Sequence, residues 1–390
     1  MRILHVVPTY LPATRYGGPI YSVHSLCKAL VALGHQVQVF TTNVDGPDDS
    51  PVPLAEPVEM DGVSVWYFPS QYLRRLYWSP SMGQCLRERI EDFDIVHLHS
   101  VFLWPTWAAA RAARKVGVPY VLSPRGMLVK DLIKRKNRLL KSSWIKLIEQ
   151  RNISGAALVH LTSEAERKDL VALGLSLTET VVIPNGVEEP IDWNKDKLSA
   201  DILGVIKNQP LVLFLGRINW KKGLDRLINS MSSILDAHLV IAGNDEENYL
   251  PRLQNLVSDN KLNSRVTFIP RNIAGDDKEA LFAAAKVFVL PSYSENFGNT
   301  VPEAMLRGCP VVVTEEVGAA DLVLRAQAGR VVSADQLSDA IEAVLNDPLS
   351  ASRMGEQGRK WASENLQWKR IAVEMTAEYQ RVLNNVSRVG

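Results

Sequence analysis

Short apolar runs alternate with amphipathic stretches along the first half of the chain. The apolar runs have the length and the valine, isoleucine and leucine content of buried strands: residues 3–7, 37–40, 95–98, 120–122, 158–161 and 181–183. Between the first two runs, Leu26, Leu30 and Leu33 recur at helical spacing, and Gly34 ends that pattern. This alternation predicts a parallel, doubly wound α/β sheet.

The same pattern restarts after a polar and charged stretch. Five more apolar runs predict strands: residues 211–215, 238–242, 266–269, 287–290 and 311–313. A helical segment follows at about 350–386. We therefore predict two similar domains, residues 1–190 and 209–365, with a linker at 191–208 and a C-terminal helix at 366–390. Because ligands bind at the carboxyl ends of strands in open α/β sheets, we expect the two domains to share one site in the cleft between them.

Length, charge and cysteine content narrow the function classes. A chain of 390 residues is too long for one ordinary core, which supports two domains. Lys and Arg number 44 against 43 Asp and Glu, so there is no basic domain to favour nucleic acid. Three scattered cysteines argue against a disulfide framework and fit a reducing compartment. The first seven residues are too short for a signal peptide, and no apolar run approaches a membrane span.

The segment from Ser294 to Glu303 carries the strongest chemical signal. Glu295 and Glu303 stand eight positions apart across a loop, Asn296-Phe297-Gly298-Asn299, that follows a predicted strand and enters a predicted helix. Free backbone N–H groups at a helix start favour phosphate, and Thr300 and Val301 are placed to offer them. Both glutamates would then face one ligand. The alternative, a capping carboxylate plus a solvent-facing one, stays open on spacing alone.

Two further loops follow predicted strands. Gly17-Gly18 precedes a helix, so the backbone there can approach an anion closely, although an ordinary tight turn explains it equally well. In Gly216-Arg217-Ile218-Asn219-Trp220-Lys221-Lys222-Gly223, Arg217 leaves a strand and Lys222 stands just before a helix. Two such cations beside a helix start form a diphosphate clamp. The alternative is two solvated basic side chains.

Three other patterns carry weaker signals. His97 and His99 alternate at a strand end, where buried, hydrogen-bonded histidines are the favoured interpretation. Asp92-Phe93-Asp94 resembles a metal-binding motif, but it leads into a strand and is interpreted as a turn. Residues 130–151 are basic and amphipathic. They predict either contact with an anionic membrane surface or a helix packed on its domain.

Together these motifs resemble glycosyltransferase family 4, the retaining nucleotide-sugar transferases of the GT-B fold. The family's order is kept in Pro184-Asn185-Gly186-Val187, in Gly216-Arg217 with Lys222-Gly223, and in Glu295 followed by Glu303. The resemblance implies a GT-B architecture of two Rossmann-like domains. The N-terminal domain would lie on the acceptor side, the C-terminal domain would bind the nucleotide sugar, and the C-terminal helix would pack back on the first.

The resemblance also assigns roles to residues. Arg217 and Lys222 would hold the diphosphate, Glu303 the ribose hydroxyls, and Glu295 the donor sugar. The remaining donor contacts would come from Gly17, Gly18, Gly243, the stretch from Asn296 to Val301 and, by main-chain contacts to the base, Arg271 to Ile273. The catalytic set is thus Glu295, Arg217 and Lys222, with no metal and no prosthetic group.

Two departures from the family affect this assignment. Where the family often has a histidine after the strand 120–122, this chain has Ser123-Pro124-Arg125-Gly126-Met127, so that the histidine's role does not transfer. Arg125 and His99 are weaker candidates for contact with the sugar or the acceptor. The glycine-rich stretch after Ala242 is reduced to Gly243-Asn244-Asp245. The Pro-Arg-Gly-Met form resembles members of bacterial polysaccharide assembly.

We predict a hexosyltransferase that uses a nucleotide-diphosphate sugar, with UDP-glucose or another UDP-hexose favoured, and a saccharide or lipid-linked saccharide acceptor. The alternatives are a UDP-sugar epimerase or phosphorylase of the same fold, or a nucleotide-sugar-binding module without turnover. The expected location is the cytoplasm, with peripheral contact to the inner face of the membrane through residues 130–151. No nucleic-acid partner is expected.

Overall fold

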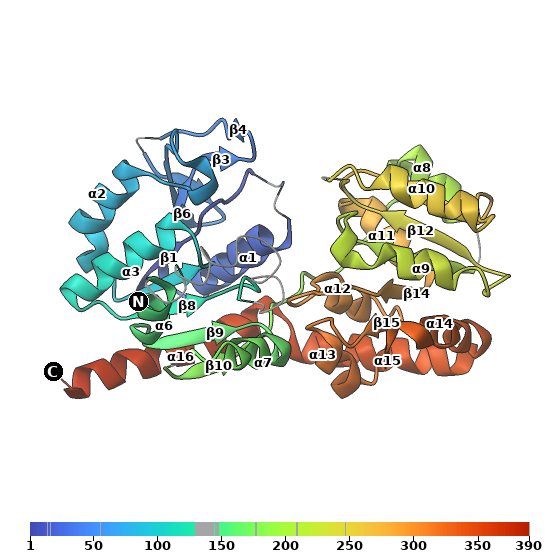
Figure 1. Ribbon diagram of the computed structural model, residues 1–390. Coiled ribbons are helices and arrows are strands. Elements are labelled where there is room, and N and C mark those ends of the chain that lie inside the picture. Colours follow the sequence, from blue (N-terminus) through green and yellow to red (C-terminus); the bar gives the residue numbers. More distant parts are fainter. Residues whose placement is uncertain are drawn as a thin grey trace. The chain divides into compact units, whose positions relative to one another are not determined.

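The structure is a computed structural model that describes residues 1–389, except 14, 16, 55, 129–143, 145–147, 176, 177, 208, 209 and 246. It divides into two compact units. Unit 1 contains Met1–Gly186 and Trp368–Gly390, and unit 2 contains Val187–Gln367. Each unit has a parallel sheet with helices on both faces, as the alternation of strands and helices predicts (Figure 1).

Unit 1 is built on an eight-stranded sheet in the order β10-β9-β8-β7-β1-β2-β6-β5. All neighbouring strands are parallel except β5 and β6. The strands are β1 (Arg2–Val6), β2 (Gln36–Thr42), β5 (Val58–Met60), β6 (Val63–Phe68), β7 (Ile95–His99), β8 (Tyr120–Ser123), β9 (Leu158–Leu161) and β10 (Thr180–Val182); a separate short pair is β3 (Val44–Asp45) with β4 (Asp48–Asp49). The described helices are α1 (Gly18–Ala32), α2 (Pro80–Arg89), α3 (Trp104–Val116), α6 (Gln150–Ser154), α7 (Glu164–Ala172) and α16 (Trp368–Val389).

Successive residues of each strand in unit 1 point to opposite faces of the sheet, and each face has its own core. In β1, Leu4 belongs to the core that includes residues of α2, α3 and α7. Its neighbour Ile3 belongs to the other core, together with residues of α1 and α16. The C-terminal helix is therefore part of the first unit, where Met375 and Tyr379 are fully buried.

Unit 2 is built on a six-stranded, all-parallel sheet in the order β13-β12-β11-β14-β15-β16. The strands are β11 (Leu211–Leu215), β12 (His238–Ala242), β13 (Val266–Ile269), β14 (Ala285–Leu290), β15 (Val311–Thr314) and β16 (Gly329–Val332). The helices are α8 (Ala200–Val205), α9 (Leu224–Ser230), α10 (Leu250–Asp259), α11 (Gly275–Ala284), α12 (Thr300–Leu306), α13 (Ala320–Ala326), α14 (Leu337–Asn346) and α15 (Pro348–Asn365). One continuous core underlies them.

The boundaries of several elements differ from those that the sequence pattern predicts. Residues 191–208, expected to be a linker, contain α8, whose Ile202 and Val205 are buried in the core of unit 2. Two apolar positions in six residues are enough for one face of a short helix, although the surrounding stretch is polar. The helix expected at about 350–386 is two helices, α15 and α16, separated at Leu366 and Gln367, where the chain passes from unit 2 to unit 1.

Candidate active site

The strand order of unit 2 reverses between β11 and β14, and this switch point is where ligands bind in open α/β sheets. The loops after both strands carry predicted site residues, 216–223 and 291–303. The loop after β11 and the loop after β12 meet closely. A Cβ atom on Gly243 would lie 2.0 Å from the carbonyl oxygen of Gly216, so only glycine fits there. The N–H of Gly243 donates to the carbonyl of Ile269 at 3.0 Å.

Three cations, Arg217, Lys221 and Lys222, gather on the loop after β11. Burial lowers the pKa of Lys221, and the neighbouring charges of Arg217 and Lys222 lower it further, while Glu247 and Glu295 act in the opposite direction. The sequence analysis singled out Arg217 and Lys222 and not Lys221, because spacing along a loop does not tell which adjacent cation interacts with the others. Asn219 holds the turn by accepting from the N–H of Lys221 at 3.1 Å.

Lys222 and Glu295, far apart in the sequence, form an ion pair through Nζ and Oε2. Both side chains are mostly buried, with 14% and 20% of their surface exposed. The backbone of Glu295 is held on both sides, because its N–H donates to Glu316 at 3.1 Å and its carbonyl accepts from Gly318 at 2.9 Å. The structure therefore brings together Lys222, which was expected to hold the diphosphate, and Glu295, which was expected to hold the sugar.

The loop after Glu295 is fixed by packing. Phe297 is buried and its carbonyl accepts from Ala319. Gly298 has a φ of 88°, a backbone conformation that favours glycine. Asn296 and Asn299 both take part in interactions within the protein.

Helix α12 has seven residues and begins at Thr300. Of the two N–H groups expected to meet phosphate, that of Val301 already donates to the carbonyl of Gly298 at 2.9 Å. This bond closes a turn at the start of the helix, and the role of Thr300 and Val301 toward phosphate stays a prediction. Glu303 lies in the first turn and pairs with Lys278 of α11 at 3.5 Å. Lys278 is a further cation that sequence spacing did not reveal.

The segment expected to contact the base lies after β13. The N–H of Arg271 donates to the carbonyl of Ile269, and its guanidinium donates to both carboxylate oxygens of Asp201 and to Asp277. Hydrogen bonds from Arg271 to Asp201 are the main cause that raises the pKa of Arg271. The side chain of Arg271 thus ties α8 and α11 to the loop, and Ile273 is buried, while the expected main-chain contacts to the base stay a prediction.

Gly17 and Gly18 lie in unit 1 at the start of α1. Gly17 has a φ of 69° and occupies the cap position, and its carbonyl accepts from Ile20. Helix α1 begins with Pro19 near its first position and has no side-chain cap. The glycines therefore make the turn that the sequence predicts and leave the helix start free of side chains.

Arg125 lies on the turn that follows β8 in unit 1. Its NH1 donates to Oδ1 of Asn185 at 2.9 Å, and its Nε and NH2 lie 3.4 and 3.3 Å from Nδ1 of His99. Burial lowers the pKa of Arg125. The N–H of Gly126 donates to the buried carboxylate of Glu166 at 2.6 Å, which fixes the turn. The structure thus brings the two weaker candidates, His99 and Arg125, into contact.

A chain of buried hydrogen bonds runs beneath this turn. Nε2 of His160 lies 2.9 Å from the carbonyl oxygen of Ile183, so this nitrogen carries the proton. Nδ1 of His160 then accepts from the hydroxyl of Ser123 at 2.8 Å, and Ser123 accepts from Nε2 of His97 at 2.7 Å. Nδ1 of His97 accepts from the hydroxyl of Tyr379 at 2.6 Å. The prediction of buried, hydrogen-bonded histidines at this strand end is confirmed.

A second buried pair completes the cluster. Nδ1 of His99 accepts from Arg125, so Nε2 of His99 carries the proton and donates to Nδ1 of His5 at 2.9 Å. Nε2 of His5 then carries a proton for which the described residues provide no acceptor. Burial is the main cause that lowers the pKa of His5 and His160 to about 3 and the pKa of His97 and His99 well below the usual value. All four imidazoles are neutral at pH 7.

Unit 1 contains two groups of side chains of the types that can bind a metal ion. Nitrogens of His5, His97 and His99 lie within 4.8 Å of one another. However, the rings of His97 and His99 are stacked with centroids 4.2 Å apart, which does not direct their in-plane lone pairs at one point. Asp94 accepts from the N–H of Arg2 at 2.7 Å, and Asp92 pairs with Arg89 at 3.8 Å. Both carboxylates lie at the amino end of β7, which agrees with the interpretation of this motif as a turn.

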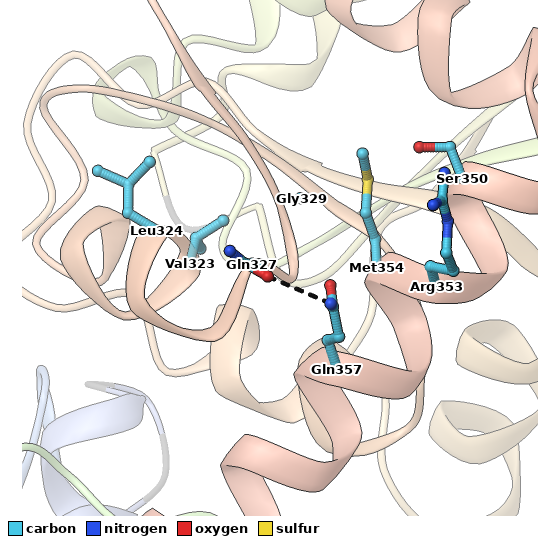
Figure 2. A pocket seen from close by; sticks show the side chains of 8 residues that line it. All are labelled: Val323, Leu324, Gln327, Gly329, Ser350, Arg353, Met354 and Gln357. Atoms are coloured by element: carbon cyan, nitrogen blue, oxygen red, sulfur yellow. Dashed lines mark hydrogen bonds between the residues drawn. The ribbon is translucent and has the colours of Figure 1, made fainter.

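A cavity of unit 2 lies away from the predicted site residues of that unit (Figure 2). It has a volume of about 390 Å³ and lies between α13, α15 and the first residue of β16. The side chain of Gln357 crosses it to donate to Oε1 of Gln327 at 3.2 Å. Because it lies at the amino end of β16, it belongs to the opposite edge of the sheet from the predicted site, and none of the predicted site residues lines it.

Residues 130–151, predicted to contact a membrane or to pack as a helix, lie largely outside the described residues. Of this segment the structure describes Trp144 and residues 148–151. Among the described residues, no helix is both long and apolar enough to cross a membrane.

Comparison with known proteins identifies the family. Residues 17–186 match the model of the glycosyl transferase 4-like domain, and residues 196–361 match that of the glycosyl transferases group 1. The chain belongs to the group 1 glycosyltransferases. The two matches follow each other along the chain in the two units, and the resemblance to glycosyltransferase family 4 is confirmed.

Relatives of this transferase span its full length. It is 26% identical to an uncharacterized glycosyltransferase of Methanocaldococcus jannaschii over 410 residues, with 100% of both chains covered. It is 27% identical to the D-inositol 3-phosphate glycosyltransferase of Pseudarthrobacter chlorophenolicus, with 98% of this chain and 94% of the relative covered.

Solved structures confirm the GT-B fold of the transferase. The sucrose-phosphate synthase from Thermosynechococcus elongatus matches with a TM-score of 0.75 at 22% identity, covering 99% of this chain and 100% of that one. Anabaena HepE in complex with UDP and glucose matches with a TM-score of 0.75 at 20% identity, covering 98% and 100%. The protein is therefore a retaining glycosyltransferase that uses a nucleotide-sugar donor.

Proposed function

We propose that this transferase moves a hexose from a UDP-sugar, with UDP-glucose favoured, to a hydroxyl group of a saccharide or lipid-linked saccharide. The observation that supports this most is the gathering of Arg217, Lys221 and Lys222 at the switch point of unit 2, beside Glu295. Anabaena HepE, which shares the fold, has been solved with UDP-glucose, and this favours the same donor here.

The chemistry proposed for these residues is stabilisation of the leaving group. As the bond between the sugar and the diphosphate breaks, negative charge grows on the phosphate oxygens, and cations already in place stabilise it. We assign this role to Arg217, Lys221 and Lys222. Glu303 would accept hydrogen bonds from the ribose hydroxyls, and Glu295 would hold the sugar. The acceptor proton would pass to the departing phosphate on the same face of the sugar.

The test is product analysis by mass spectrometry in the presence of excess EDTA. UDP-glucose, UDP-galactose and GDP-mannose are supplied in turn with a panel of saccharide and lipid-linked acceptors. We expect the acceptor mass to increase by one hexose with a UDP-hexose, without added metal, because the described cations can offset the charge of the diphosphate. Transfer with GDP-mannose alone would contradict the UDP donor, and activity that requires Mg²⁺ or Mn²⁺ would contradict the charge assignment.

The same assay separates the alternative functions. An epimerase would convert UDP-glucose to another UDP-hexose without acceptor, and a phosphorylase would release glucose 1-phosphate when inorganic phosphate is added. A binding module would bind UDP-glucose and leave it intact. Each of these products would contradict transfer to a saccharide hydroxyl.

A further inference from the structure

Arg125 occupies an unfavourable backbone conformation. Its φ is 55°, in the left-handed region that residues with a long side chain seldom adopt. It stands on the turn after β8, beside the point where the strand order of unit 1 reverses between β7 and β1. Ligands bind at such switch points, and strain of this kind persists where the surroundings impose it for a functional reason.

The surroundings impose the conformation through Glu166. One carboxylate oxygen of Glu166 accepts from the N–H of Gly126 at 2.6 Å. The other accepts from the N–H and the hydroxyl of Thr162 at 2.8 and 3.1 Å. The carboxylate is therefore committed to the backbone of the turn and of the loop after β9. It acts on Arg125 through space only, and none of the ion pairs among the described residues includes Arg125.

The hydrogen-bond partners of Arg125 are neutral. A guanidinium has five N–H groups. Three of them are directed at Nδ1 of His99 and Oδ1 of Asn185. The other two, one on each terminal nitrogen, have no partner among the described residues. A guanidinium carries its N–H groups in a planar fork, and the side chain of Arg125 is only partly exposed.

The side chains in hydrogen-bonding contact with Arg125 supply no counter-charge, and the charge of Glu166 acts on it only through space. The nearby histidines, His5, His97, His99 and His160, are buried, and the charge of Arg125 is among the causes that keep them neutral. A largely buried cation that no carboxylate contacts directly is stabilised by an anionic ligand, and a guanidinium matches the two oxygens of a carboxylate or phosphate.

We propose that Arg125 is an anion-binding site of unit 1 that pairs with a carboxylate or phosphate group carried either by the acceptor or by the transferred sugar. This inference rests on the proposed function, since it specifies a feature of the substrate of that reaction. It makes the enzyme selective for an anionic sugar through a residue other than those assigned to the diphosphate.

The first experiment compares simple sugars as probes. Binding of glucose 6-phosphate, glucuronate and glucose is measured by calorimetry for the wild type, Arg125→Asn and Lys115→Gln, all saturated with UDP. Asparagine tolerates the left-handed conformation, so Arg125→Asn should fold as well as the wild type. Lys115 is exposed on α3 and provides a matched loss of one positive charge.

We expect the wild type to bind at least one anionic sugar at least tenfold more tightly than glucose. Arg125→Asn should lose this preference and Lys115→Gln should keep it. Arg125→Lys, which retains the charge but not the fork, should retain part of it. Equal binding of glucose and both anionic sugars by the wild type, or an unchanged preference in Arg125→Asn, would overturn the proposal.

The second experiment distinguishes the two sources of the anion. A UDP-glucuronate preference over UDP-glucose that Arg125→Asn abolishes places the anion on the transferred sugar. A preference for phosphorylated acceptors that Arg125→Asn abolishes places it on the acceptor. UDP affinity is measured in parallel. If the wild type does not bind UDP, the proposed function is contradicted. If the wild type binds UDP and Arg125→Asn has no effect on either preference, this inference alone is contradicted.

Discussion

The side chains of Lys222 and Glu295 form an ion pair with each other. The ammonium that we assign to the diphosphate is paired with the carboxylate that we assign to the sugar. In the proposed function, Lys222 would exchange this carboxylate for phosphate oxygens when a donor binds, and Glu295 would be released toward the sugar hydroxyls. The ion pair would then compete with the nucleotide for the same cation.

This competition gives the two glutamates of the loop opposite effects on UDP binding. We expect Glu295→Gln to bind UDP about two- to fivefold more tightly, since a partly exposed ion pair is worth about 0.5–1 kcal/mol. Its turnover should fall, because the sugar loses its charged contact. Glu303→Gln should bind UDP about ten- to a hundredfold more weakly, since a hydrogen bond to a charged group is worth about 1.5–3 kcal/mol.

Calorimetric UDP titrations and initial rates measure both effects, with circular dichroism as the check of folding. Weaker UDP binding by Glu295→Gln together with unchanged binding by Glu303→Gln would reverse the assignment. If neither variant changed binding or rate, the loop would be structural.

Gly186, in the family motif Pro184-Asn185-Gly186-Val187, packs against α16, which begins at Trp368. A Cβ atom at Gly186 would lie 2.5 Å from the indole of Trp368, the first residue of α16. The neighbouring Asn185 accepts from Arg125. One short motif thus both packs against the C-terminal helix and holds the guanidinium of Arg125.

We expect Gly186→Ala to lower the free energy of unfolding of unit 1 by about 1–3 kcal/mol, the usual cost of overpacking a filled site. The matched control is Gly204→Ala in α8, where an added Cβ meets nothing within 4 Å and alanine favours the helix. The free energies of unfolding of both variants are measured by denaturant unfolding that is monitored by hydrogen exchange. Equal stability of Gly186→Ala and the wild type would show that Trp368 shifts freely.

Most strands could be predicted from the sequence, because buried parallel strands are short apolar runs, and those in the central positions of both sheets match the observed ones closely. Strand β6 was missed although Val63, Val65 and Tyr67 alternate with more exposed residues, a pattern that does indicate a strand. Strand β16 was missed for a different reason. It is a short edge strand containing Arg330, and Gly329 is needed there because a Cβ would lie 1.8 Å from the carbonyl oxygen of Val311, a contact that no local pattern reveals.

The sequence predicts which loops carry the candidate site better than it predicts which side chains of those loops contact each other. Strand ends identified the loops that carry Arg217, Lys222 and Glu295, because the fold class fixes which edge of the sheet holds them. The contacts of Glu295 with Lys222 and of Glu303 with Lys278 join separate elements. Such pairings depend on how strands and helices pack, and residue spacing does not encode them.

The two units differ in their sensitivity to acid. Unit 1 contains four fully buried histidines whose pKa values are lowered in the folded state: His5, His97, His99 and His160. The unfolded chain binds protons at these residues below the usual pKa of 6.5, whereas the folded unit does not. Folding is therefore favoured above pH 6.5 and loses stability as the pH falls from 6.5 toward 3, by up to about 1.4 kcal/mol per pH unit for each histidine.

We expect unit 1 to unfold on mild acidification before unit 2, because residues 187–367 contain a single histidine, His238, whose pKa is lowered. Hydrogen exchange at pH 7.5 and 5.0 measures this by peptide. Residues 1–186 and 368–389 should lose protection first, while 187–367 remain protected and are further stabilised by UDP. Simultaneous loss of protection in both units, or earlier loss in unit 2, would contradict the role of the histidines.

Helix α16 is the last element of the chain and yet part of the first unit, where Tyr379 reaches the imidazole of His97. During synthesis, the strands of unit 1 leave the ribosome before those of unit 2, but the face that receives Ile371, Met375 and Tyr379 stays uncovered until α16 has been made. Unit 2, a single continuous segment, has all of its residues before then. Unit 1 is therefore begun before unit 2 and completed after it, and a premature stop near residue 367 would spare unit 2 and leave unit 1 without the helix that covers one face of its sheet.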